Sequence, residues 1–284
     1  MIKFSVTTLA TEGVIAPVDL MPKLAAWGYD GIELWGGDLP GAEHVTWFRE
    51  DSVRIEDVYQ ADRATDQELD ALAKLKAVAD RVGLAISMIA PYFDFISGSQ
   101  RFDESLLVGA RYVEYAHALG CKLIRTMTGG SGSARGSVPS SALTDAEWNA
   151  CIRGLKALST LPDAEDVVFA IETHSMRPED TIETVLRQMH EVGAANVRVL
   201  LQPNQFVTKI AGMTAQKMLD ALYPYTVHLH EHTGMKDSPV GWQYLIGELR
   251  RRGFDGYLSI ERARPEPRLL SLEREIPWLR SVSS

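Results

Sequence analysis

Residues 167–174 read VVFAIETH, an unbroken apolar run that stops at Glu172 and His174. Three later stretches have the same form: VRVLLQPNQ at 197–205, TVHLHEH at 226–232 and YLSIER at 257–262. A strand that is apolar at consecutive positions is buried on both faces, which is typical of a parallel sheet covered by helices. The sequence therefore predicts buried parallel strands that end in polar side chains.

Amphipathic helices are expected between such strands along the whole chain. In residues 66–82, apolar side chains recur every three residues and Gly83 follows as a helix-ending residue. Thr144 and Glu147 have the spacing of a capping box that begins another helix. Strands are expected at 3–9, 30–35, 84–90, 122–127, 167–171, 197–201, 226–229 and 257–260. Eight strand–helix units predict an α/β fold, a single (β/α)8 TIM barrel. The alternative, a doubly wound open sheet, lacks a GxGxxG motif after the first strand.

Nothing in the composition divides the chain, so residues 1–284 are predicted to form one barrel domain. Two connections, 36–64 and 128–143, are longer than a barrel needs. Both follow the carboxyl end of a strand, where barrels keep their active sites. We therefore expect them to be active-site loops that act as lids, the alternative being solvated surface loops.

Composition and charge narrow the classes of partner. The formal net charge of −9 argues against nucleic acid, because an acidic surface repels phosphate. No apolar run is long enough for a membrane span, and the N-terminal segment does not read as a signal peptide. Cys121 and Cys151 lack CxxC spacing and fit a reducing compartment. A cytoplasmic protein is expected, with a homo-oligomer among its expected states because barrels of this kind often pair.

The polar residues at four consecutive strand ends would meet at one rim of a barrel. They are Glu172, Gln202, His228 and Glu261. Two carboxylates brought together repel each other, and a divalent cation between them removes that penalty. An imidazole and an amide oxygen can complete the ligand set, which suits manganese first, with magnesium, cobalt and zinc as alternatives. The competing interpretation is that strands simply end in polar residues where they reach the surface.

These strand ends resemble the xylose isomerase-like barrel superfamily, which includes sugar isomerases, ketose 3-epimerases, inosose dehydratase and endonuclease IV. The matching elements are GYDGIEL at 28–34, IETH at 171–174, HLHE at 228–231 and GYLSIE at 256–261. The resemblance implies one divalent metal ion bound by Glu172, Gln202, His228 and Glu261. Gln202 stands where the family has an aspartate, and Gln205 where it has a histidine that grips substrate. Lys236 is the substitute for an arginine that the epimerases place at Gly234.

The chemistry that follows is proton transfer on a small-molecule carbohydrate. A metal ion binding a hydroxy-carbonyl sugar would make the neighbouring C–H acidic. Glu172 and Glu261 are the expected catalytic residues, exchanging that proton through a metal-stabilised enediolate. The prediction is a sugar isomerase or epimerase. The alternatives are a lyase or dehydratase of a keto-sugar or keto-inositol, and a metal-free carbohydrate-binding barrel without turnover. Endonuclease activity is disfavoured by the acidic charge.

Further residues are expected to contact the substrate. His174 and His230 lie one strand period from the predicted ligands, so they point to the same side. Trp35 would stack on a sugar ring, the alternative being an aromatic side chain packed at the rim, and the resemblance adds Gln205 and Lys236. Arg125 is expected to pair with a buried carboxylate. Three arginines after the eighth strand lie where barrels often bind phosphate, although solvation of the surface is the favoured interpretation for them: Arg262, Arg264 and Arg268.

Overall fold

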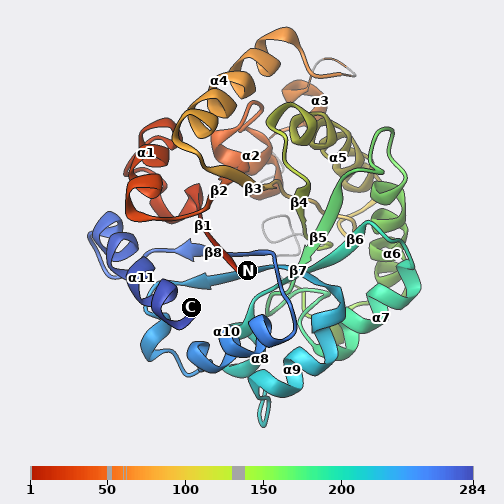
Figure 1. The fold of residues 1–284 in the computed structure, drawn as a ribbon. Helices are drawn as coiled ribbons and strands as arrows, with labels where there is room; N and C mark the ends of the chain where they lie inside the picture. The colour runs from red at the N-terminus through yellow and green to blue at the C-terminus, as the bar shows by residue number, and fades with distance from the viewer. Residues whose placement is uncertain (1, 50–52, 60, 62, 130–137, 284) are drawn as a thin grey trace.

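The computed structural model describes all residues except 1, 50–52, 60, 62, 130–137 and 284. The described residues form eight parallel strands that close into a barrel in chain order, and the prediction of a single (β/α)8 TIM barrel is confirmed (Figure 1). The strands are β1 (Lys3–Thr7), β2 (Gly31–Trp35), β3 (Ala85–Ala90), β4 (Leu123–Thr126), β5 (Val168–Glu172), β6 (Val197–Leu201), β7 (Thr226–His232) and β8 (Tyr257–Arg262).

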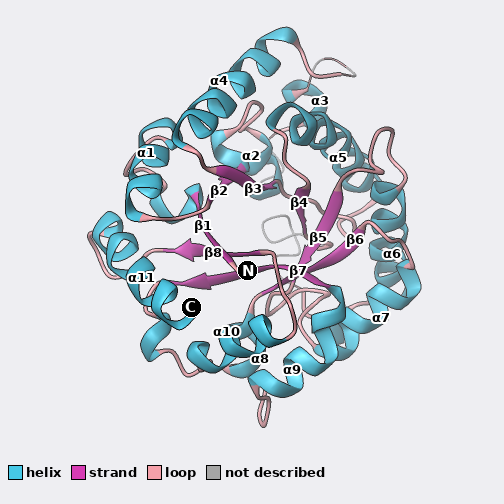
Figure 2. Cartoon of the chain, in the orientation of Figure 1, coloured by secondary structure: helices cyan, strands magenta, loops and turns pink. Residues whose placement is uncertain are grey.

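Helices surround the strands on all sides (Figure 2). They are α1 (Pro17–Trp27), α2 (His44–Arg49), α3 (Ile55–Val58), α4 (Asp66–Val82), α5 (Ser99–Leu119), α6 (Asp145–Ser159), α7 (Ile182–Val192), α8 (Pro203–Val207), α9 (Ala215–Leu222), α10 (Trp242–Arg251) and α11 (Arg268–Ser283). The capping box predicted for α6 is present, because Thr144 accepts from the backbone of Glu147 and Glu147 accepts from Thr144. No helix in the described part of the chain is both long and apolar enough to cross a membrane.

Two of the apolar clusters lie on opposite sides of the strands. The larger one lies between the strands and the surrounding helices and includes Phe4, Leu34 and Phe169, which are fully buried. A smaller cluster contains Met88, Ala170 and Leu200. Ala170 lies two residues before Glu172, and Leu200 two before Gln202, so these side chains point to the same side as the polar strand ends. The smaller cluster therefore forms an apolar floor beneath the polar residues at the carboxyl ends.

Three strands extend further than the apolar pattern indicates. β5 includes Glu172, β8 runs to Arg262, and β7 runs to His232 rather than ending at Leu229. Polar side chains in these extensions find partners inside the barrel, as His230 does with Glu33 and Glu172. Because their polar atoms are satisfied there, the backbone pairing continues past the last apolar residue.

The connection 36–64 contains more regular structure than a loop, namely a 3-10 turn at Gly36–Asp38 and the helices α2 and α3. Its α2 is anchored to α5, because Trp47 Nε1 donates to Glu104 and Arg101 donates to the carbonyl oxygen of Trp47. In the second connection, 128–143, residues 130–137 lie outside the described residues. The role of both segments as lids stays a prediction.

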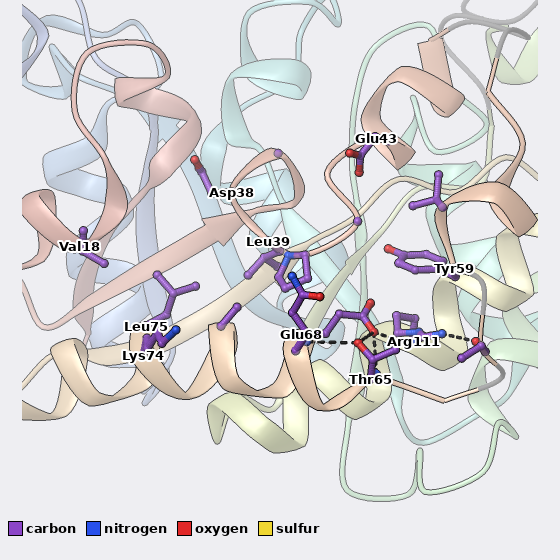
Figure 3. Close-up of a pocket in the computed structure, with 17 residues that line it drawn as sticks. Val18, Asp38, Leu39, Glu43, Tyr59, Thr65, Glu68, Lys74, Leu75 and Arg111 are labelled. Carbon is purple, nitrogen blue, oxygen red and sulfur yellow. Dashed lines mark hydrogen bonds and ion pairs between the residues drawn. The ribbon is translucent and has the colours of Figure 1, made fainter.

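A cavity of about 780 Å³ lies between the connection 36–64 and α4 (Figure 3). Its wall includes Tyr59, Glu68 and Arg111, and Arg111 donates to Glu68 at 2.9 Å. The Arg111 guanidinium also covers the Tyr59 ring, with 4.9 Å to the ring centroid. The polar residues at the strand ends do not line this cavity, so it is separate from the site described next.

Candidate active site

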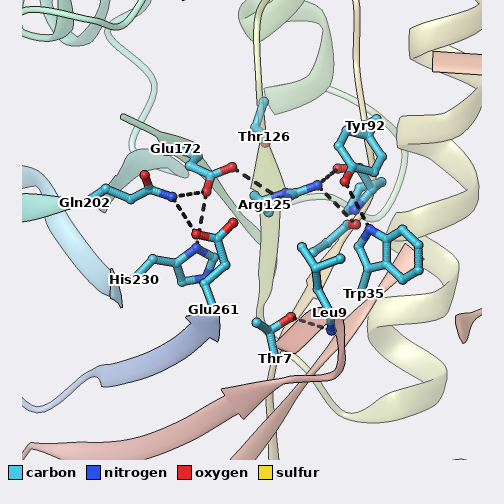
Figure 4. Close-up of polar contacts among 12 residues, drawn as sticks. Thr7, Leu9, Trp35, Tyr92, Arg125, Thr126, Glu172, Gln202, His230 and Glu261 are labelled. Atoms are coloured by element: carbon cyan, nitrogen blue, oxygen red, sulfur yellow. Dashed lines mark hydrogen bonds and ion pairs between the residues drawn. The ribbon is translucent and has the colours of Figure 1, made fainter. Parts of the chain in front are cut away.

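Three of the four predicted metal ligands meet at the carboxyl ends of the strands (Figure 4). The side-chain nitrogen of Gln202 donates to Glu172 Oε1 at 2.5 Å and to Glu261 Oε2 at 3.2 Å. Its oxygen accepts from Gln205 Nε2 at 3.0 Å. One amide group thus lies between two carboxylates that belong to strands distant in sequence, and it holds both.

His230 joins this group in the position where His228 was expected. Its Nδ1 lies 3.2 Å from Glu172 Oε1, and its Nε2 lies 2.8 Å from Glu33 Oε2. His228 is buried deeper in the barrel, where its Nε2 shares a hydrogen bond of 2.8 Å with Ser259 Oγ. Both histidines point into the barrel, but β7 continues to His232, so the second histidine reaches the level of Glu172 and Glu261.

Arg125 pairs with a buried carboxylate, as the sequence suggested. Its Nη1 lies 3.5 Å from Glu172 Oε2, and both side chains are buried. The guanidinium stacks over Tyr92, 4.5 Å from the ring centroid, and donates to the carbonyl oxygen of Pro91 at 3.0 Å. This fixed cation holds one oxygen of Glu172 and leaves the other facing Gln202 and His230.

The pKa values of the two carboxylates are shifted in opposite directions. Burial would raise the pKa of Glu172, but Arg125 and His230 outweigh it and lower that pKa. Burial and the negative charge of Glu172 both raise the pKa of Glu261. Burial would lower the pKa of His230, but Glu33 and Glu172 raise it instead. The group therefore demands positive charge, which a proton or a divalent cation can supply.

The remaining residues predicted to contact substrate lie at different places relative to the carboxylate group. His174 donates from Nδ1 to the carbonyl oxygen of Ser175 at 2.7 Å, and Gln205 accepts from the backbone of Ser175 at 3.3 Å, so both lie beside the group. Trp35 is buried and donates from Nε1 to the Tyr92 hydroxyl at 3.0 Å. Lys236 is exposed and makes no hydrogen bond or ion pair with the described residues. The substrate roles of all these residues stay predictions.

Glu33 is the site residue to which sequence reasoning assigned no role. It is 1% exposed and lies against both histidines, 2.8 Å from His230 Nε2 and 3.4 Å from His228 Nε2. The available signal was its place in the GYDGIEL motif at the end of the second predicted strand. A lone carboxylate on the opposite side of the barrel gave no indication of which histidine it would orient.

The geometry of these side chains fits a divalent metal ion. Glu172, His230 and Glu261 offer ligand atoms that all lie within 4.8 Å of one another, and Glu33, His228 and His230 form a second such group. Glu33 engages Nε2 of His230 and so leaves Nδ1 directed at Glu172. Carboxylates commonly orient metal-binding histidines in this way. The first group also has two carboxylates flanking a shared space, which is the donor set that a divalent cation prefers.

Comparison with known proteins identifies the family. The model of the xylose isomerase-like TIM barrel family matches residues 21–282. The chain belongs to this family. No curated protein matches it in sequence.

Solved structures with the same fold have different names. The probable 3-DHS dehydratase AsbF from Bacillus anthracis has a TM-score of 0.75 at 19% identity, covering 98% of this chain and 99% of its own. The 3-keto-D-glucoside 4-epimerase YcjR from E. coli has 0.73 at 15%, covering 99% and 100%. D-Psicose 3-epimerase from Clostridium cellulolyticum H10 has 0.73 at 13%, covering all of both chains, 100% each. At these identities the similarity establishes the fold.

Proposed function

We propose that this xylose isomerase-like barrel is a divalent-metal-dependent sugar isomerase or epimerase that moves a proton next to a carbonyl group. The observation that carries the proposal is the pair Glu172 and Glu261, joined by the Gln202 amide beside His230. The epimerases and the dehydratase that share the fold are consistent with carbon-acid chemistry at this end of the barrel. The proposed substrate is a small carbohydrate, and both neutral and charged carbohydrates belong to the proposed class.

The metal ion would be held by Glu172, His230 and Glu261, with Gln202 as a neutral neighbour. Mn²⁺ is our first choice of ion because the donors are oxygen and nitrogen without thiolate, and Mg²⁺, Co²⁺ and Zn²⁺ accept the same donors. When bound, such an ion supplies Lewis-acid polarisation of the substrate carbonyl. His230 rather than His228 is the proposed imidazole ligand, because it lies beside both carboxylates.

The two glutamates have different proposed tasks. Arg125 lowers the pKa of Glu172 against the effect of burial, so Glu172 remains anionic and can accept a proton. Burial and the charge of Glu172 raise the pKa of Glu261, so Glu261 holds a proton more readily and can return it. Titratable pairs whose environments separate their pKa values commonly divide acid and base roles in this way.

The surroundings of the pair strengthen its electrostatic contacts with a substrate. Glu172 is 2% exposed, and the floor beneath it is made of Met88, Ala170 and Leu200. Low-polarity walls strengthen each electrostatic contact between the side chains and a developing negative charge. Glu261 is the more accessible of the two glutamates, with 13% of its side chain exposed, so a sugar would approach the pair from its side.

Proton exchange with solvent tests the proposed function directly. The Mn²⁺-loaded protein is incubated in deuterated water with a panel of ketoses and keto-sugars, and the products are followed by NMR. We expect deuterium at the carbon next to the carbonyl group. We also expect a second sugar that is an isomer of the first and differs from it in mass only by the deuterium. A product that has lost water would identify a lyase instead. Metal-loaded protein that exchanges no proton on any sugar of the panel would contradict the proposal.

Gln202→Asp is expected to bind Mn²⁺ more tightly, by about tenfold or more. The substitution replaces a neutral group between Glu172 and Glu261 by a carboxylate, and each added negative ligand strengthens the attraction to a divalent cation. Isothermal titration calorimetry measures the affinity, with Gln243→Asp on the exposed face of α10 as the control for added charge. An affinity equal to that of the unchanged protein would show that residue 202 does not contact the ion.

A further inference from the structure

Another cavity opens at the rim formed by the ends of β1, β7 and β8. Its volume is about 760 Å³, and its wall includes Leu9 after β1, Thr233 after β7, and Arg262 and Arg264 at the end of β8. All of these positions lie at the carboxyl ends of the strands, on the same side of the barrel as Glu172 and Glu261. The cavity therefore lies at the same end of the barrel as the carboxylate group.

The arginine side chains of this cavity differ in whether they form hydrogen bonds or ion pairs. Arg268 uses its guanidinium on Glu266 Oε1 at 2.8 Å and on the carbonyl oxygen of Glu12 at 3.0 Å. Arg262 and Arg264 form no ion pair or hydrogen bond through their side chains within the described part of the chain. The wall also carries the carboxylates of Glu12 and Glu266, of which Glu266 is paired with Arg268. Two guanidinium groups thus remain available in a protein whose net charge is −9.

The backbone of the two arginines is held in place by the end of β7. The Thr233 amide donates to the carbonyl oxygen of Arg262 at 2.9 Å, and the Arg264 amide donates to Thr233 Oγ1 at 2.7 Å. Ala263 between them is buried, while the side chains on either side of it are exposed. Residues two apart in an extended segment share a side, so the two guanidinium groups project from one fixed edge.

The same edge is adjacent to the carboxylate group. Arg262 directly follows Glu261, and it lies opposite His232 in the pairing of β7 with β8. His232 Nε2 lies 3.8 Å from Glu261 Oε2. A molecule of sugar size whose reacting carbon lies at Glu172 and Glu261 can therefore extend past His232 toward the two arginines.

Backbone amides at this rim are already occupied. Gly234 and Met235, after β7, donate their amides to the carboxylate of Glu275 at 2.8 and 3.0 Å. In many barrels the loops after the seventh and eighth strands bind phosphate, often with help from such amides. The guanidinium groups of Arg262 and Arg264 are left for that task, and a guanidinium matches the paired oxygens of phosphate and carboxylate.

We propose that the substrate carries an oxyanion, a phosphate or a carboxylate, at the end remote from its reacting carbon, and that Arg262 and Arg264 bind this group. The inference rests on the proposed function for the position of the reacting carbon. It deepens that function by naming the substrate class, a sugar phosphate or a sugar acid, and by assigning the residues that select it.

The first test measures binding without turnover. Inorganic phosphate and acetate are titrated into the metal-free protein, and chemical shifts or calorimetry report the affinity. The double variant Arg262→Met, Arg264→Met is compared with the unchanged protein and with Arg81→Met on the exposed face of α4. We expect the double variant to lose at least about tenfold in phosphate or acetate affinity, because two charge-assisted contacts are removed. Equal affinity in all three proteins, or no binding to any, would overturn the proposal.

The second test separates this inference from the proposed function. Ketoses are compared with their terminal phosphates and with the corresponding sugar acids, using kcat/KM of the metal-loaded protein. We expect the unchanged protein to prefer one charged series by about 100-fold. We expect the double variant to lose that preference, read as the ratio of kcat/KM on charged sugars to kcat/KM on neutral sugars. The preferred series identifies phosphate or carboxylate. Turnover of neutral sugars without any preference would overturn the inference and leave the proposed function standing. Arginine-dependent binding of phosphate or acetate without turnover of any sugar would contradict the proposed function. The oxyanion site at Arg262 and Arg264 would then still stand.

Discussion

Glu172→Gln is expected to reduce kcat by about 10³-fold or more and to weaken Mn²⁺ binding, because one carboxylate supplies both charge to the ion and a base to the substrate. The substitution also leaves Arg125 buried without its carboxylate partner, 3.5 Å away in the native site. Steady-state rates on the best sugar of the panel and calorimetric titration with Mn²⁺ give the two readouts. Thermal unfolding is measured alongside, because an unpaired buried cation lowers stability.

Two further variants make the Glu172 result interpretable. Glu261→Gln removes the other carboxylate without affecting Arg125, and it is expected to give the same loss of turnover and metal. Glu179→Gln makes the same chemical change at a fully buried glutamate that bonds Thr128. Burial raises the pKa of Glu179. Within the described part of the chain, Glu179 forms no hydrogen bond or ion pair with the carboxylate pair or with Gln202, so near-native activity is expected. Full turnover and metal affinity in either site variant would remove the carboxylate pair from the mechanism.

The two histidines of β7 are expected to differ sharply. His230→Asn should lower Mn²⁺ affinity by about 100-fold or more, because Nδ1 beside Glu172 is the proposed nitrogen ligand. His228→Asn should keep metal affinity within a few-fold, because His228 contacts Ser259 and Glu33 below the carboxylate pair. Its main cost is expected in stability, by about 1–3 kcal/mol, since it disturbs a buried hydrogen bond.

Calorimetry with Mn²⁺ and thermal unfolding of both histidine variants provide the measurement. Each variant acts as the matched control for the other, because both shorten a buried imidazole on the same strand. If His228→Asn lost the metal and His230→Asn retained it, the ligand set first inferred from the sequence would hold and the one inferred from the structure would fall.

The barrel and most of its elements were predictable from local patterns. A helix is recognisable by apolar side chains on one face and by capping residues, as at Thr144, and a buried parallel strand by its continuous apolar run. The short helices α2 and α3 were missed, because His44, Trp47 and Phe48 pack against α5 and the segment before it rather than follow a long amphipathic pattern. Their helical form depends on contacts with residues distant in sequence.

The convergence of Glu172, Gln202 and Glu261 was determined by the sequence alone, because strand ends in a closed barrel have nowhere else to lie than one rim. The identity of the histidine beside them was not. His228 and His230 lie two residues apart on one strand, so side-chain alternation places both on the same side of the sheet. Alternation does not say how deep in the barrel each side chain lies. Depth is set by how far β7 stays paired, and that depends on Glu33 and Glu172 satisfying His230 from across the barrel.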